Sequence, residues 1–152
     1  MTGQRDGGVP IDVLLVEDNP GDVRLTREAF RDANMSIRLH VVSDGVEAMA
    51  FVRQEAKHAD APRPDLILLD LNLPRIDGRE VLARIKSDDD LKTIPTVILT
   101  TSGAQADILR SYQLHANAYV SKPLQLDAFQ GLVSCINEFW LMKVMLPHRR
   151  NT

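Results

Sequence analysis

Short runs of apolar residues alternate with longer amphipathic segments along the chain, and no other feature restricts its possible folds as strongly. The short runs cover residues 13–16, 37–42, 66–69, 96–99 and 118–120. VLLV, LILL and TVIL are continuously apolar apart from one threonine, which is typical of parallel strands covered by helices on both faces. IRLHVV alternates apolar with polar residues, as an edge strand does. The alternation therefore predicts an α/β domain with a five-stranded parallel sheet and helices on both faces.

Capping residues mark the starts of the helices between these strands. Asn19 precedes Pro20, which suits an N-cap followed by the first helical position, and Asp44 precedes a glycine before an amphipathic segment. The predicted helices cover about 20–33, about 45–57, the segment that follows Asp77-Gly78, about 105–115, and the segment that follows Lys122-Pro123. These elements predict one domain over 11–146 with an extended last helix, a flexible leader over 1–10 and a flexible tail over 147–152.

Composition narrows the partners of this domain. The 152 residues include 18 Lys and Arg against 21 Asp and Glu, a formal net charge of -3, so the chain has no cationic field for nucleic acid or an anionic membrane. Its apolar stretches are far shorter than the roughly 20 residues that span a bilayer. Cys135 is the only cysteine, which suits a reducing compartment, and residues 1–10 lack the apolar core of a signal peptide. We therefore expect a cytoplasmic protein that binds neither nucleic acid nor a membrane.

Chemically active side chains lie at the ends of four predicted strands. They are Glu17 and Asp18 after the first strand, Asp70 after the third, Thr100 at the fourth and Lys122 after the fifth. Ligands of open parallel sheets bind beyond the carboxyl ends of the strands, so we expect these side chains to meet. Clustered carboxylates repel one another unless a cation lies among them, and oxygen ligands of this charge favour Mg²⁺. A carboxylate beside Mg²⁺ and an ammonium group can attack phosphorus, and Asp70 with Lys122 fits that chemistry.

The sequence around these residues resembles the CheY-like receiver domains of response regulators in two-component signalling. The resemblance covers Ile11 to about Phe139 and is carried by VLLVEDN, LILLDLNLPRIDG, ILTTS and AYVSKP. The spacing is also similar, with Thr100 lying 30 residues after Asp70 and Lys122 lying 22 residues after Thr100. The resemblance implies a flavodoxin-like doubly wound sheet of order 2-1-3-4-5. It also implies a signalling protein that catalyses only its own phosphorylation and dephosphorylation.

The resemblance assigns roles to the acidic residues. Asp70 would accept a phosphoryl group from a phosphohistidine of a sensor histidine kinase. Asp18, Asp70 and the backbone carbonyl of Asn72 would hold Mg²⁺, and Glu17 would act on the metal directly or through a water molecule.

Three further residues receive roles from the same resemblance. Lys122 would contact the phosphoryl group, and the hydroxyl of Thr100 would hydrogen-bond one of its oxygens. Tyr119 would rotate inward as Thr100 moves, so that Thr100 and Tyr119 form a switch. The physical basis is differential contact, because a phosphoryl group that fits one loop arrangement better shifts a pre-existing equilibrium toward it.

A closer resemblance is to single-domain regulators paired with phytochrome-type histidine kinases. It is carried by DLNLPRIDGREVLARIK, IPTVILTTS and the segments 112–115 and 139–141. It implies a light-sensing kinase as phosphodonor and a homodimer through helix 4, strand 5 and helix 5. The helix end FWLMKVML is apolar nearly all round, which favours a partner surface, with burial against the domain itself as the alternative. The predicted dimer or partner surface contains Tyr112, Phe139, Trp140 and Val144.

Three other functions are compatible with parts of this pattern. A docking-only pseudo-receiver would keep the fold without phosphorylation, and the complete acidic site argues against it. A flavodoxin-like FMN protein needs a phosphate-binding first turn, whereas EDNPGD is acidic and no glycine-rich loop is present. An aspartate-nucleophile phosphatase needs a second carboxylate as general acid, but Asn72 lies two residues after Asp70. The sequence therefore favours a phosphorylated receiver.

Overall fold

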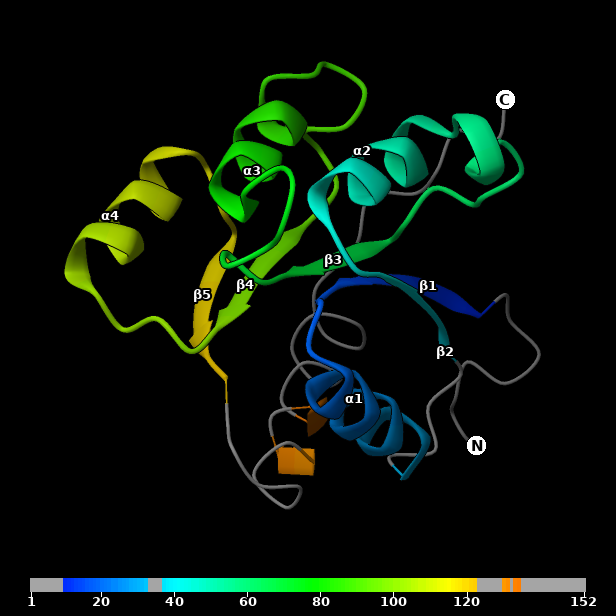
Figure 1. The fold of residues 1–152 in the computed structure, drawn as a ribbon, viewed down its shortest axis with the longest axis horizontal. Helices are drawn as coiled ribbons and strands as arrows, with labels where there is room; N and C mark the ends of the chain where they lie inside the picture. The colour runs from blue at the N-terminus through cyan, green and yellow to red at the C-terminus, as the bar shows by residue number, and fades with distance from the viewer. Residues whose placement is uncertain (1–9, 33–36, 123–129, 132, 135–152) are drawn as a thin grey trace.

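The computed structural model has the predicted alternation of strands and helices (Figure 1). It describes residues 10–32, 37–122, 130, 131, 133 and 134. The strands are β1 (Ile11–Val16), β2 (Ile37–Val42), β3 (Leu66–Leu69), β4 (Thr96–Thr100) and β5 (Ala118–Ser121). The helices are α1 (Pro20–Asp32), α2 (Gly45–Arg53), α3 (Gly78–Lys86), α4 (Gln105–Gln113) and the short 3-10 helix η1 (Ala56–His58).

All five strands form one parallel sheet in the order β2-β1-β3-β4-β5, which confirms the predicted flavodoxin-like order. β1 pairs with β2 from Ile11 opposite Ile37 to Val16 opposite Val42, so the alternating strand does lie at an edge. On its other side β1 pairs with β3, and Val16 lies opposite Leu69. The chain therefore leaves β1 and β3 side by side, at the point where the strand order reverses.

Helices cover both faces of this sheet, as predicted (Figure 1). On one face, Met49 of α2 and Leu82 of α3 share a buried cluster with Leu14 of β1. On the other face, Phe30 of α1 shares a second cluster with Leu15. Successive side chains of a strand point to opposite faces, so neighbours in β1 belong to different clusters. This two-sided burial explains why the central strands are continuously apolar.

Side-chain caps begin the helices where the sequence predicts them. Asn19 Oδ1 accepts the backbone N–H three residues on at 3.0 Å, and Asp44 Oδ1 accepts the corresponding N–H of α2 at 2.8 Å. The predicted end of the second helix at about residue 57 is wrong, because α2 ends at Arg53. Gln54 adopts the left-handed conformation with φ 57, and its N–H bonds back to carbonyls of the last turn, which closes the helix.

The end of the predicted domain lies largely outside the described residues. Residues 130, 131, 133 and 134 are helical, and Val133 is buried in the cluster on the α1 face of the sheet. The rest of the predicted last helix, the tail over 147–152 and, except for Pro10, the leader over 1–10 lie outside these residues. Within the described part of the chain, no helix combines the length and apolarity needed to cross a bilayer.

Candidate functional site

Three acidic side chains converge at the carboxyl ends of β1 and β3. Glu17 and Asp18 follow β1 directly, and Asp70 follows β3. Each offers a carboxylate oxygen, and these oxygens all lie within 4.8 Å of one another. Glu17 and Asp70 are buried, whereas Asp18 is exposed to solvent. The oxygens fit a divalent cation that prefers oxygen ligands and keeps some of its waters. We call these three residues together with Lys122 the acidic site.

Lys122 supplies the positive charge of the acidic site. It follows β5, and its Nζ donates hydrogen bonds to Glu17 Oε1 at 2.6 Å, Asp70 Oδ2 at 2.9 Å and Asp22 Oδ2 at 3.0 Å. The lysine side chain is only 3% exposed, so its pairs with Glu17 and Asp70 are shielded from water. With Asp18 included, four carboxylates lie around one ammonium group. This excess of negative charge favours the binding of a further cation.

Backbone contacts orient the two buried carboxylates. The N–H of Asn19 donates to Glu17 Oε2 at 3.1 Å, and the N–H of Asn72 donates to Asp70 Oδ1 at 3.2 Å. Gly78 lets the start of α3 approach the backbone of Asp70, because a Cβ at this position would lie 2.2 Å from the Asp70 carbonyl oxygen. The loop after β3 is therefore packed against the helix that follows it.

Burial and charge act in opposite directions on titration in the acidic site. Burial raises the pKa of Glu17 to about 7, although the hydrogen bonds from Lys122 and from the backbone of Asn19 lower it. Burial lowers the pKa of Lys122, but its hydrogen bonds to Glu17, Asp70 and Asp22 outweigh burial and hold that pKa above its ordinary value. Lys122 is therefore cationic at neutral pH, whereas Glu17 exchanges its proton near neutrality.

The two predicted switch residues lie on β4 and β5. Thr100 is buried at the end of β4, and its Oγ1 accepts a hydrogen bond from the N–H of Ser102 at 3.4 Å. Tyr119 is half-buried against the cluster beneath α2 and α3, and its hydroxyl donates to the Ser102 carbonyl at 2.8 Å. Both side chains therefore contact the loop between β4 and α4. Among the described residues, neither is hydrogen-bonded to the carboxylate of Asp70, so their switching role stays a prediction.

Of the residues predicted to form the dimer surface, only Tyr112 lies among the described residues. Tyr112 and Leu109 lie three residues apart on α4, on one face of the helix, and are 48% and 60% exposed. The hydroxyl of Tyr112 accepts the backbone N–H of Tyr119 at 3.2 Å, so this face adjoins β5. The other predicted members lie outside the described residues: Phe139, Trp140 and Val144.

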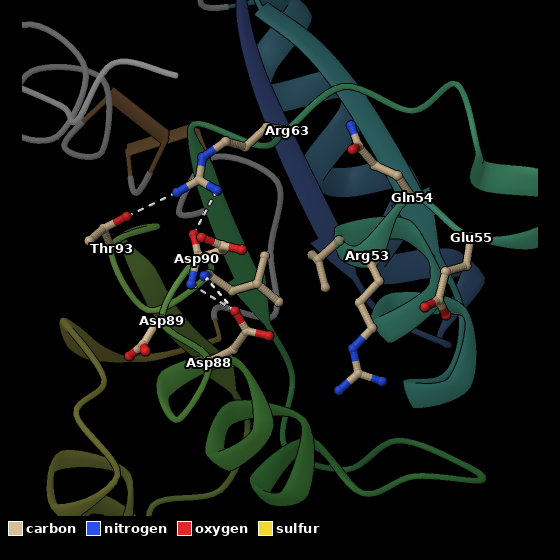
Figure 2. Close-up of a pocket in the computed structure, with 10 residues that line it drawn as sticks. Arg53, Gln54, Glu55, Arg63, Asp88, Asp89, Asp90 and Thr93 are labelled. Carbon is tan, nitrogen blue, oxygen red and sulfur yellow. Dashed lines mark hydrogen bonds between the residues drawn. The ribbon is translucent and has the colours of Figure 1, made fainter. Parts of the chain in front are cut away.

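A second acidic group lies at the opposite end of the sheet, beside an open cavity of about 810 Å³ (Figure 2). This acidic turn, residues 88–90, lies between α3 and β4. Asp88 Oδ1 accepts the N–H groups of Asp90 and Leu91 at 2.8 and 3.1 Å. Arg63 donates to the carbonyl of Asp90 and to Thr93 Oγ1 at 2.7 and 2.9 Å (Figure 2). These hydrogen bonds fix the conformation of the loop between α3 and β4.

The order of the parallel sheet, with acidic residues after β1 and β3 and a lysine after β5, is the arrangement predicted for a receiver domain. The chain belongs to the response regulator receiver domain family, whose model matches residues 13–134. This range contains every residue of the acidic site. The predicted family is confirmed, and the flavoprotein and phosphatase alternatives are not favoured.

Similar proteins include regulators with a bound metal or a phosphoryl group. The chain is 48% identical over 135 residues to response regulator Rcp1 of Synechocystis sp.. The aligned region covers 89% of this chain and 92% of Rcp1. The crystal structure of the Mn²⁺-bound form of Rcp1 superposes with a TM-score of 0.86 at 47% identity, covering 91% of this chain and 100% of that chain. The crystal structure of the phosphorylated cyanobacterial phytochrome response regulator RcpA superposes with a TM-score of 0.87 at 51% identity. The match covers 91% of this chain and 99% of that chain. The metal-bound relative and the carboxylate cluster support a divalent-metal site in this chain.

Asp22 contacts the acidic site through Lys122, and the sequence pattern does not single it out. It lies in the first turn of α1, four residues after Asp18, and contacts Lys122 across 100 residues of sequence. The available signal is the acidic turn EDNPGD, whose last residue faces the same edge of the sheet once the helix begins at Pro20. A pair between Arg79 and Asp107 has no comparable sequence signal, because the two residues belong to different helices.

Proposed function

We propose that Asp70 accepts a phosphoryl group from a phosphohistidine of a sensor histidine kinase. The observation that carries this proposal is the buried ammonium group of Lys122, which lies 2.9 Å from Asp70 Oδ2 within the carboxylate cluster. A cation beside the acceptor carboxylate offsets the charge on the transferred oxygens in the transition state. Membership of the receiver family and the phosphorylated relative RcpA support the proposal.

The proposed reaction is a single displacement at phosphorus. A carboxylate oxygen of Asp70 forms the new bond, the bond to the kinase histidine breaks, and the histidine nitrogen leaves with the electron pair. Lys122 neutralises charge on the phosphoryl oxygens. Attack by water at phosphorus later breaks the bond to the Asp70 oxygen, which releases inorganic phosphate and restores the Asp70 carboxylate. The protein thus processes only its own phosphoryl group and has no separate small-molecule substrate.

The proposed metal is Mg²⁺, held by Asp18, Asp70 and the backbone carbonyl of Asn72, with Glu17 acting directly or through a water. The oxygens within 4.8 Å of one another and the excess of carboxylates over the single ammonium support this choice. When bound, Mg²⁺ supplies charge neutralisation for the incoming phosphoryl oxygens. Asp22 pairs with Lys122 and would hold its ammonium group toward Asp70.

The proposed output is a change at the loop between β4 and α4. The hydroxyl of Thr100 bonds a phosphoryl oxygen in the phosphorylated form, and the inward position of Tyr119 is then favoured. The hydrogen bonds of both side chains to Ser102 support this coupling, because they tie the two residues to one loop.

The proposed partners are a phytochrome-type histidine kinase and a second copy of the chain. The high identity to the phytochrome response regulator RcpA supports the kinase. The exposed apolar face of α4 at Leu109 and Tyr112 supports a homodimer through α4, β5 and the last helix. A cytoplasmic location and the lack of nucleic-acid or membrane binding remain predictions from composition.

Transfer from a labelled kinase tests the central proposal. The protein is incubated with Mg²⁺ and an autophosphorylated phytochrome-type histidine kinase, and we expect an alkali-labile label on wild type and on Asp88→Asn but none on Asp70→Asn. A wild-type protein without label would favour the docking-only alternative, and turnover of a small phosphoester would favour the phosphatase. The dimer is tested by size-exclusion chromatography of Trp140→Glu. If wild type elutes as a dimer and the variant elutes at the same volume, the assignment of Trp140 to the dimer interface is wrong.

A further inference from the structure

Arg79 and Asp107 form a two-pronged ion pair between the first turns of α3 and α4. Arg79 Nε lies 2.9 Å from Asp107 Oδ1, and Nη2 lies 2.8 Å from Oδ2. The two side chains are 32% and 20% exposed, so the pair is partly shielded from solvent. Such a bidentate pair holds both planar groups in one relative orientation, which a single contact does not.

On the α3 side, Arg79 is tied to the loop that carries Asp70. Its Nη1 donates to both carboxylate oxygens of Asp77 at 3.1 Å, and its backbone N–H is capped by Asp77 Oδ1 at 2.8 Å. The preceding residue, Gly78, donates its N–H to the carbonyl of Leu71 at 2.9 Å. The position of Arg79 therefore follows the loop immediately after the phosphoacceptor.

On the α4 side, Asp107 is tied to the loop after β4. Its Oδ2 accepts the hydroxyl of Ser102 at 2.6 Å. The carbonyl of Ser102 accepts a hydrogen bond from the hydroxyl of Tyr119, and the N–H of Ser102 donates one to Thr100 Oγ1. The hydrogen bonds thus run without a gap from the Asp70 loop to both predicted switch residues. They are made in an arrangement where Tyr119 is half-buried and packs against the core.

We propose that Arg79 is a positioning residue whose pair with Asp107 holds the β4–α4 loop in the arrangement that the phosphorylated form requires. This inference rests on the proposed function of Asp70. β3 and β4 are neighbours in the sheet, so the two loops leave it side by side, and the ion pair links them beyond the strand ends. Removing the pair frees the loop to adopt other positions. The phosphorylated arrangement then costs more free energy to form.

The test is a double-mutant cycle on the affinity for beryllofluoride, which mimics a phosphoryl group on a carboxylate, at saturating Mg²⁺ in the full-length chain. We expect Arg79→Gln and Asp107→Asn each to weaken beryllofluoride binding about fivefold or more, and the double variant to weaken it no further. The affinity for Mg²⁺ alone should stay at the wild-type value, because neither residue contacts the acidic site. That separation distinguishes positioning from general damage to the fold.

Arg84→Gln is the matched control, because it removes an exposed pair with Glu80 on the same helix, with Nε at 3.0 Å from Oε2. It should leave both affinities unchanged. Ser102→Ala offers a second route should a charge variant fail to fold, and it should weaken beryllofluoride binding in the same direction. Unchanged or tighter beryllofluoride binding in the variants would overturn the inference, as would an equal loss of Mg²⁺ affinity. Failure of wild type to bind beryllofluoride would instead overturn the proposed function.

Discussion

The carboxylates of Glu17, Asp18 and Asp70 lie at one end of the sheet, and the three consecutive carboxylates of residues 88–90 lie at the other. In the acidic site, oxygens from two strand ends lie within 4.8 Å of one another and a buried lysine joins them. In the acidic turn, Asp88 accepts backbone N–H groups, and Asp89 is 94% exposed beside Lys92. Equal numbers of carboxylates therefore produce a concentrated charge at one end and a solvated loop at the other.

The difference shows that closeness in sequence is a poor guide to a charged site. Asp18 and Asp70 are 52 residues apart, yet neighbouring parallel strands bring them to one edge. Consecutive residues of a turn instead point in different directions, and their carboxylates bond to nearby backbone N–H groups. Substitutions that remove the same charge from the acidic site and from the acidic turn can therefore separate the effect of burial from the effect of charge alone.

The largest expected effect is on the free energy of unfolding after removal of the buried ammonium. Lys122→Met leaves the Glu17 and Asp70 carboxylates without their cation, and we expect a loss of roughly 3 kcal/mol in urea unfolding at pH 8 without divalent metal. Added Mg²⁺ should restore part of that loss. Lys92→Met, which removes the exposed partner of Asp89, should change stability by less than about 0.5 kcal/mol. Equal losses in the two variants would contradict the distinction between the groups.

The next effect is on metal affinity. Asp18→Asn removes one charged oxygen from the cluster, and we expect at least about tenfold weaker Mg²⁺ or Mn²⁺ binding in a calorimetric titration. Asp89→Asn removes an equal charge from the acidic turn and should leave the affinity unchanged. Similar weakening by both substitutions would mean that the metal responds to net charge and not to a defined site.

A smaller effect is expected from pH. The metal competes with the proton on Glu17, whose pKa is raised to about 7, so affinity should fall about fivefold between pH 7 and pH 6. Glu17→Gln should flatten this dependence. In the metal-free protein, protonation of Glu17 instead increases the free energy of unfolding. A raised pKa means that the folded state binds the proton more tightly than the unfolded chain does. That contribution to stability is present below the ordinary value of 4.5 and is lost as pH rises through about 7. A pH-independent affinity in wild type would contradict this assignment.

The smallest effect is expected in the acidic turn itself. Asp88→Ala leaves the N–H of Asp90 without its acceptor, and it removes one of the two acceptors of the Leu91 N–H, which still bonds to the Asp88 carbonyl. We expect the free energy of unfolding to fall by about 1 kcal/mol. Metal affinity and phosphorylation should not change, because the turn lies at the other end of the sheet. Asp89→Ala is the control that removes a solvated carboxylate. A change in phosphotransfer after either substitution would show that the two ends communicate.

The strands and helix starts follow from local rules. The continuous apolar runs predict buried parallel strands, and Asn19 and Asp44 cap helices as their type and position predict. The end of α2 is missed because Gln54 adopts a left-handed conformation that its residue type does not favour. The core of the site is predictable because strand order brings the ends of β1 and β3 together.

The sequence by itself determined which segments become strands and helices and which chemical groups stand at the strand ends, because hydrophobic period and capping act over a few residues. Only the tertiary structure decided that Asp22 joins Lys122 and that Arg79 pairs with Asp107. Those partners are distant in sequence, and their meeting depends on how each helix packs on the sheet and on which rotamer each side chain adopts there. Such choices are set by the whole surrounding core, and no short stretch of sequence contains them.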